Sequence, residues 1–173
     1  MNVDSFGVPD NFFGTHDEDF YGAIGRIAGL CALIENQTLV LFQTMMNLPQ
    51  TTDTQLPASQ LLDKAFKGLD SIDGDENKKI LFQYFTDVKT TLRQRNDYIH
   101  NLWPKQPGDS LFGWRPNPDK ETRAHQPHIV TQTNLGELKA FIVTLVEVVR
   151  CRDQVYGSAC ALQDVKLRDG ALS

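Results

Sequence analysis

The sequence predicts an all-α protein: an up-down bundle of the four-helix type with a Pro-rich excursion, which could hold a β-hairpin, between the third and fourth helices. Three observations predict this fold. Apolar residues recur at alternating steps of four and three in three long segments. A shorter helical segment follows the first of them. Five of the eight prolines lie between residues 104 and 134, which excludes a helix there.

The first helix is expected from about Glu18 to Asn47, where Pro49 stops it. One stripe of its residues should be buried, namely Phe20, Ile24, Ile27, Cys31, Ile34, Thr38, Leu41 and Met45. Arg26 and Glu35 interrupt its apolar run, which is therefore shorter than the roughly 20 residues that a bilayer requires. We expect a core helix and no membrane span. Three glycines on this helix indicate either close approach of another helix or simple tolerance of glycine, and they are Gly22, Gly25 and Gly29.

The second helix is expected over about Ala58 to Leu69, and a break with a glycine follows at residues 71–75. The third should begin near Glu76 and end just before Pro104, a length of roughly 40 Å at 1.5 Å per residue. Its core stripe should be Leu81, Phe85, Val88, Leu92, Arg95, Ile99 and Leu102.

Within the excursion, the runs LFGW and HIVTQT could pair as a small hairpin beside the end of the third helix. The last helix should start at the cap Asn134, with Glu137 at the capping-box position, and continue to about Tyr156. Its buried face should comprise Leu135, Leu138, Ile142, Leu145 and Val149. The expected organisation is an acidic arm over residues 1–17, a bundle over 18–156 with the excursion at 104–134, and a tail over 157–173.

Charge and cysteine content limit the classes of function. The net charge is −5, and the first 19 residues carry five carboxylates but no Lys or Arg, so a signal peptide is not expected. Near the end of the third helix the local charge is positive, because there are four basic residues, Lys89, Arg93, Arg95 and Lys105, and one acidic residue, Asp97. This charge permits a phosphate ligand. The three cysteines form no CxxC pair, which favours reduced structural thiols in the cytoplasm.

Arg95 occupies a core-facing position in the helical period of the third helix, where a charged guanidinium is not expected. Such a group must meet a carboxylate, a phosphate or a wet cleft. A salt bridge to Glu35 in the first helix explains Arg95 but not its neighbours. Asn96 and His100 lie four residues apart on an adjacent face of the helix, so guanidinium, amide and imidazole converge within one and a half turns.

The run Arg95-Asn96-Asp97-Tyr98-Ile99-His100 resembles the signature of the HEPN superfamily of helical bundles. That signature is an Arg, often followed by a polar residue, and then a His after four to six intervening residues, near the end of a long helix. The placement matches over about residues 18–156: a long first helix with a central Glu, the motif late in the third long helix, and a final long helix. Some toxin members carry a tyrosine two residues after the His, where this chain has Leu102.

The resemblance implies a metal-independent endoribonuclease that needs no cofactor and usually works as a homodimer. It implies that Arg95 holds the scissile phosphate, that Asn96 orients the phosphate or the His, and that His100 transfers protons. The expected ends are a 2′,3′-cyclic phosphate or 3′-phosphate and a 5′-hydroxyl. Imidazole suits acid and base work near neutral pH, and the guanidinium suits bidentate phosphate contact. The implied partners are RNA and an antitoxin or nucleotidyltransferase of a toxin, defence or stress system. The alternative is a non-catalytic bundle that binds a nucleotide or a protein.

Further residues complete the set of candidates. Arg93, Lys105 and Arg115 are expected to bind RNA phosphates, and Glu35, Tyr98 and Trp103 to support the site. Trp103 is expected to pack, whereas Trp114 could either pack or stack on a base. His125 and His128 have the HxxH spacing of some metal sites, but no Cys or acidic cluster accompanies them, so a solvated loop is favoured and no metal site is expected.

Overall fold

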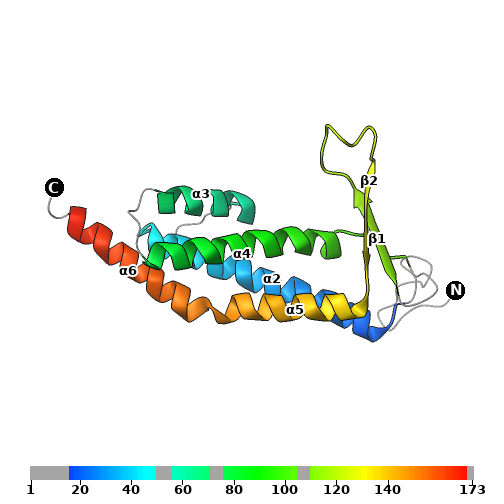
Figure 1. Ribbon diagram of the computed structural model, residues 1–173, viewed down its shortest axis with the longest axis horizontal. Helices are drawn as coiled ribbons and strands as arrows, with labels where there is room; N and C mark the ends of the chain where they lie inside the picture. The colour runs from blue at the N-terminus through cyan, green and yellow to red at the C-terminus, as the bar shows by residue number, and fades with distance from the viewer. Residues whose placement is uncertain (1–15, 50–55, 71–75, 105–109, 171–173) are drawn as a thin grey trace. The chain divides into compact units, whose positions relative to one another are not determined.

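The computed structural model describes residues 16–49, 56–70, 76–104 and 110–170, and most of them are helical (Figure 1). In chain order the elements are α2 (Glu18–Met45), α3 (Ala58–Asp70), α4 (Glu76–Ile99), β1 (Leu111–Pro116), β2 (His128–Thr133), α5 (Leu135–Arg150) and α6 (Arg152–Gly170). The predicted helical class is confirmed. Most of the arm at residues 1–17 and part of the loop after Pro49 lie outside the described residues.

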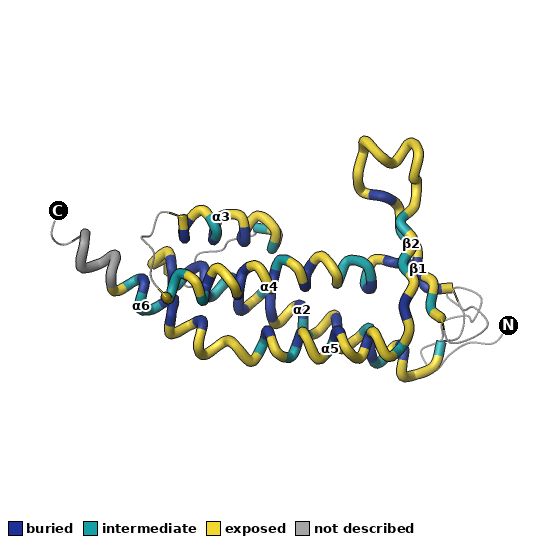
Figure 2. The backbone as a smooth tube through the Cα atoms, in the orientation of Figure 1, coloured by how far each residue is buried: buried dark blue, intermediate teal, exposed yellow. Residues whose placement is uncertain are grey.

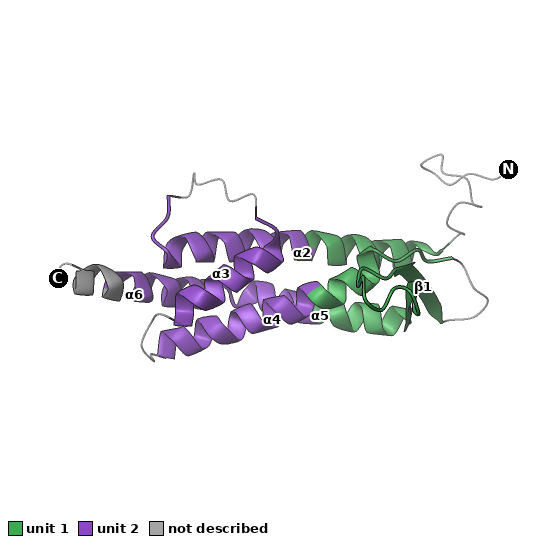
Figure 3. Cartoon of the chain, turned by 90° about the horizontal axis from the view of Figure 1, so that it is seen from above, with its two compact units in different colours: residues 1–29, 93–143 green, residues 30–92, 144–173 purple. Residues whose placement is uncertain are grey.

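The chain divides into two compact units, each made of two separate stretches (Figure 3). We call residues 1–29 and 93–143 the hairpin unit, and residues 30–92 and 144–173 the helical unit. The boundaries fall inside α2, α4 and α5. The motif at the end of α4 belongs to the hairpin unit.

The helical unit is held together by an apolar core. Its fully buried side chains include Ile34, Leu41, Met45, Leu62, Leu69, Leu81, Phe85, Val88, Leu145 and Leu162. Phe66 of α3 contacts Phe82 and Phe85 of α4 edge-on, at 5.2 and 6.1 Å between ring centroids. Accordingly, α3 lies alongside α4 (Figure 1).

A Schellman-type cap ends α2 close to the predicted position. The amide of Leu48 donates to the carbonyl of Gln43 at 2.8 Å, and the amide of Asn47 to that of Thr44 at 3.1 Å. Asn47 has a φ of 53°, the left-handed conformation that this cap requires and that Asn tolerates. The cap stops α2 before Pro49 could do so.

The hairpin unit contains the predicted hairpin, which is confirmed. β1 and β2 pair antiparallel in a register that sets Trp114 opposite Val130 and Phe112 opposite Gln132. On its other edge β1 pairs with the chain that leaves α4. There the amide of Leu102 donates to the carbonyl of Trp114 at 2.8 Å, and the amide of Trp114 donates back at 3.0 Å.

Because Leu102 is paired to β1, α4 is shorter than predicted. It ends at Ile99, before the expected stop at Pro104. The predicted core stripe is buried from Leu81 to Leu92, but beyond Arg95 it fails, since Ile99 is only half-buried and Leu102 is 47% exposed. Tyr98 is buried in their place.

The last helical region also differs from its prediction. The cap is present, since the amide of Glu137 donates to Asn134 Oδ1 at 2.9 Å, and the Glu137 carboxylate accepts from the Thr133 hydroxyl at 2.8 Å. The buried residues of α5 are Leu138, Phe141, Leu145 and Val148, so Leu135, Ile142 and Val149 were assigned wrongly to the core face and are half-buried. The single helix predicted to run to Tyr156 is wrong, because α5 ends at Arg150 and a second helix, α6, runs from Arg152 to Gly170. The tail predicted to begin at residue 157 is therefore helical, with Ser158, Ala159 and Leu162 buried.

The glycines of α2 were expected to indicate either close approach of another helix or simple tolerance of glycine. A Cβ built on Gly25 or Gly29 meets nothing within 4 Å, which agrees with simple tolerance and not with close approach of another helix. Among the described residues, α2 is the one helix that is long and apolar enough to cross a bilayer, with 33% of its most apolar stretch buried. A core helix meets the same criterion, so this is weak evidence for a membrane span.

Cys31, Cys151 and Cys160 are free thiols.

Candidate functional site

The candidate site begins with Arg95 and Asn96 in the last turns of α4. The guanidinium of Arg95 donates through Nη2 to Asn96 Oδ1 at 3.2 Å. Both side chains are half-buried. The two residues that the resemblance pairs are therefore in direct contact, and Asn96 limits the directions in which the guanidinium can point.

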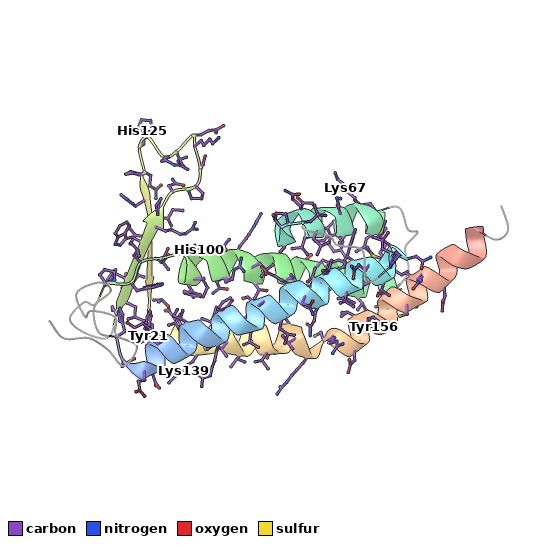
Figure 4. All side chains as sticks on the ribbon, turned by 180° about the vertical axis from the view of Figure 1, so that it is seen from behind. Tyr21, Lys67, His100, His125, Lys139 and Tyr156 are labelled. Atoms are coloured by element: carbon purple, nitrogen blue, oxygen red, sulfur yellow. The ribbon has the colours of Figure 1, made fainter. Side chains whose placement is uncertain are left out.

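His100 is the first residue beyond α4. Its amide still donates to the carbonyl of Asn96 at 3.4 Å, so the chain keeps the pitch of the helix for one more residue. The side chain is exposed and lies at the end of α4, beside the strands of the hairpin, whereas His125 lies at the far end of the hairpin loop (Figure 4). The structure thus puts an exposed imidazole one helical turn after Asn96, whereas the HxxH loop lies away from the end of α4.

Arg115 of β1 is tied to α4 by an ion pair. Its Nη2 lies 3.0 Å from Asp97 Oδ1, and its side chain is only 17% exposed. A phosphate contact by Arg115, as expected from the sequence, would have to compete with this carboxylate. Arg93 is exposed on α4, and Lys105 lies outside the described residues.

Tyr98 and Trp103 are buried aromatic residues at the end of α4. The indole of Trp103 is buried, donates to the carbonyl of Tyr98 at 2.8 Å, and contacts Phe20 at 6.0 Å between ring centroids. The ring of Tyr98 lies 5.2 Å from that of Phe141 in α5. Trp103 thus packs, as expected, and both residues hold the end of α4 in place.

Glu35 belongs to the helical unit, whereas Arg95 belongs to the hairpin unit. The salt bridge considered from the sequence is therefore not a contact within either unit, and it stays a prediction. Glu35 is half-buried on α2.

Asn101 was missed in the sequence. It directly follows His100 and is 7% exposed, and both its amide nitrogen and its amide oxygen are buried without a hydrogen-bond partner. Such groups are uncommon in folded proteins and often mark functional positions. No pattern in the sequence indicated its burial, because an Asn beside a helix end is ordinarily a solvated cap.

Two other features lie apart from this site. Among the described residues, no group of three or more His, Cys, Asp or Glu side chains could hold a metal ion. In the helical unit, a small pocket of about 110 Å³ is lined by α2 and α6, including Gln37, Arg152 and Tyr156 (Figure 4 labels Tyr156). It contains none of the predicted site residues.

Comparison of the chain with protein-family models, with curated proteins and with solved structures finds no match. The assignment of function therefore depends on the motif and its geometry.

Proposed function

We propose that this protein is a HEPN-type, metal-independent endoribonuclease that leaves 2′,3′-cyclic phosphate or 3′-phosphate and 5′-hydroxyl ends. The observation that supports it best is the contact between Arg95 and Asn96 one turn before an exposed His100. This reaction requires a cation that holds the phosphate and an accessible acid–base group, and an amide can orient the cation.

In the proposed reaction, Arg95 binds the non-bridging oxygens of the scissile phosphate and neutralises the charge that develops on them. The 2′-oxygen attacks phosphorus, and the bond from phosphorus to O5′ breaks. One imidazole takes the 2′-hydroxyl proton, and one imidazolium gives a proton to O5′. A homodimer would supply His100 twice, once for each task.

The wider proposal follows the resemblance. The fold is an up-down four-helix bundle, and the protein works in the cytoplasm as a homodimer within a toxin, defence or stress system. An antitoxin or a nucleotidyltransferase restrains it. The runner-up is a non-catalytic bundle whose site binds a nucleotide or a protein partner, since a net charge of −5 is low for a protein that binds long RNA.

The test is end-mapping of total cellular RNA after incubation with the purified protein in excess EDTA. Wild type should produce cuts with 5′-hydroxyl ends, and His100→Ala and Arg95→Ala should slow them by on the order of 10²- to 10⁴-fold. His125→Ala is the matched control, because it removes an exposed imidazole from the far end of the hairpin loop. Intact RNA with wild type, or equal cutting by His100→Ala, would contradict the proposal.

A further inference from the structure

The outer face of the hairpin carries a row of exposed apolar side chains. Directly opposed residues of antiparallel strands, and residues two apart on one strand, project to the same face. The register therefore puts Leu102, Trp114 and Val130 side by side across three strands, with Phe112 next to Trp114 along β1. These four are 47%, 39%, 66% and 38% exposed, respectively. We call them the outer hairpin face.

The opposite face of the hairpin is already occupied. A Cβ on Gly113 would lie 2.8 Å from the ring of Trp103, so Gly113 is the residue that lets this ring pack flat on β1. Thr133 at the other end of the hairpin is also buried. Because the inner face is filled, the aromatic rings of the outer face are held outward by a packed sheet. Figure 2 shows the exposed stretches of the hairpin.

The composition of the outer hairpin face fits the flat bases of a nucleic acid. Trp114 and Phe112 offer ring surfaces on which bases can stack. The other residues of this face in β1 and β2 are Pro116, His128 and Gln132, so none of the described residues on it is a carboxylate. The ring of His128 stands at 86° to that of Trp114, with centroids 5.1 Å apart, and braces one side of the indole.

The outer hairpin face is also close to the candidate site along the chain. Leu102 lies two residues after His100, and its amide and carbonyl are both bonded to Trp114. The hydrogen-bonded strand that carries the exposed indole is therefore attached directly to the segment that carries the imidazole. His100 lies at the end of α4, beside the strands of this hairpin (Figure 4).

We propose that the outer hairpin face binds single-stranded RNA by stacking one base on Trp114 and a neighbouring base on Phe112. The backbone of the bound strand then passes Arg95 and His100, so the enzyme selects unpaired RNA. This last step rests on the function proposed above, whereas the stacking does not. A second copy of the chain fits this face less well, since four side chains at these exposures offer roughly 300 to 400 Å², about half of what each partner buries in a stable interface.

The test uses an eight-nucleotide strand with 2′-O-methyl groups throughout, which cannot be cleaved because the 2′-oxygen is blocked. The chain has two tryptophans, of which Trp103 is buried, so quenching of fluorescence on binding should report Trp114. Trp114→Leu should weaken binding by on the order of 5- to 150-fold, as expected for loss of one stacked base, and Trp114→Phe should retain most of it. A duplex of the same sequence should bind more weakly, because its bases are already stacked.

Tyr156→Leu is the matched control, because Tyr156 is an aromatic residue of similar exposure, 41%, in the helical unit. Equal binding by wild type and Trp114→Leu would overturn the inference, and so would dimerisation that Trp114→Leu abolishes in sedimentation. The two proposals fail separately. Quenching without cleavage of unmodified RNA would support the stacking face and contradict the nuclease. Cleavage with the same KM in wild type and Trp114→Leu would support the nuclease and contradict the stacking face.

Discussion

Asn101 and Asn117 are two buried asparagines of the hairpin unit with opposite hydrogen bonding, which makes them a matched pair for mutation. Asn101 is 7% exposed and its two amide atoms have no partner. Asn117 is 5% exposed; its amide nitrogen donates to Thr122 and Gln126, and its oxygen accepts from the amide of Asp119, all at 2.9 to 3.0 Å. Replacing each by Leu removes the same polar groups from different surroundings.

The expected effects have opposite signs. A buried polar group without a partner costs about 1–3 kcal/mol, so Asn101→Leu should raise the free energy of unfolding by about that amount. Asn117→Leu should lower it by about 1–3 kcal/mol, because it leaves the groups that bonded Asn117 without partners. At roughly 2–4 °C per kcal/mol for a chain of this size, the two melting temperatures should differ by about 4–24 °C.

Thermal unfolding followed by circular dichroism measures both variants, and Asn101→Ala separates the polar effect from any clash of the larger Leu. If Asn101→Leu and Asn101→Ala both destabilise the protein as much as Asn117→Leu does, the amide of Asn101 has a partner and the reasoning is wrong. A gain in stability with a loss of RNA cleavage would instead identify Asn101 as a polar group that serves the site.

Three further predictions concern stability. Gly25→Ala should raise the free energy of unfolding by about 0.5–1 kcal/mol in urea titration, since the helix gains propensity and the Cβ meets open space, whereas Gly113→Ala should lower it by clashing with an indole. Burial raises the pKa of Tyr84 to about 12, so the folded state holds this proton more tightly than the unfolded chain does. The stability that this proton contributes is complete below pH 10 and is lost between pH 10 and 12. Tyr84→Phe should reduce that loss by about 2–3 kcal/mol. Equal profiles of stability against pH for wild type and Tyr84→Phe would contradict this prediction. Asp97→Ala should destabilise by about 1–3 kcal/mol, because it strands the largely buried guanidinium of Arg115, and a change near zero would show that solvent replaces the carboxylate.

The elements that the sequence predicted correctly are those encoded by local pattern. The start of α2, both ends of α3 and the two strands follow from periodicity, glycine, proline and capping residues that lie within a few positions of each boundary. The contact between Arg95 and Asn96 depends on the length of the Arg side chain, which lets the guanidinium bend to the next residue although consecutive helix residues project in different directions.

The wrong predictions concern helix ends and buried faces that depend on contacts between segments far apart in the sequence. α4 was predicted too long because Ile99, Leu102 and Trp103 continue its apolar pattern, while pairing of Leu102 with Trp114 depends on a strand that no local window contains. The core face of α5 was out of phase because apolar residues cover both sides of that helix, so periodicity alone could not choose between Ile142 and Phe141. Asn101 was missed since its burial comes from tertiary packing.

The discontinuous make-up of the hairpin unit has a consequence for the order of events in folding. His16 bonds to the carbonyl of Trp103 across 87 residues, and Lys139 lies 3.2 Å from Asp19 across 120. Contacts this far apart in sequence close large loops and form late, and during synthesis the segment at residues 16–29 emerges long before its partners. Arg95 and His100 are therefore not held in their final setting until the chain has been made through residue 143. Until residue 143 has emerged from the ribosome, the nascent chain carries no finished site, so a partner that restrains the proposed nuclease need not bind before that point.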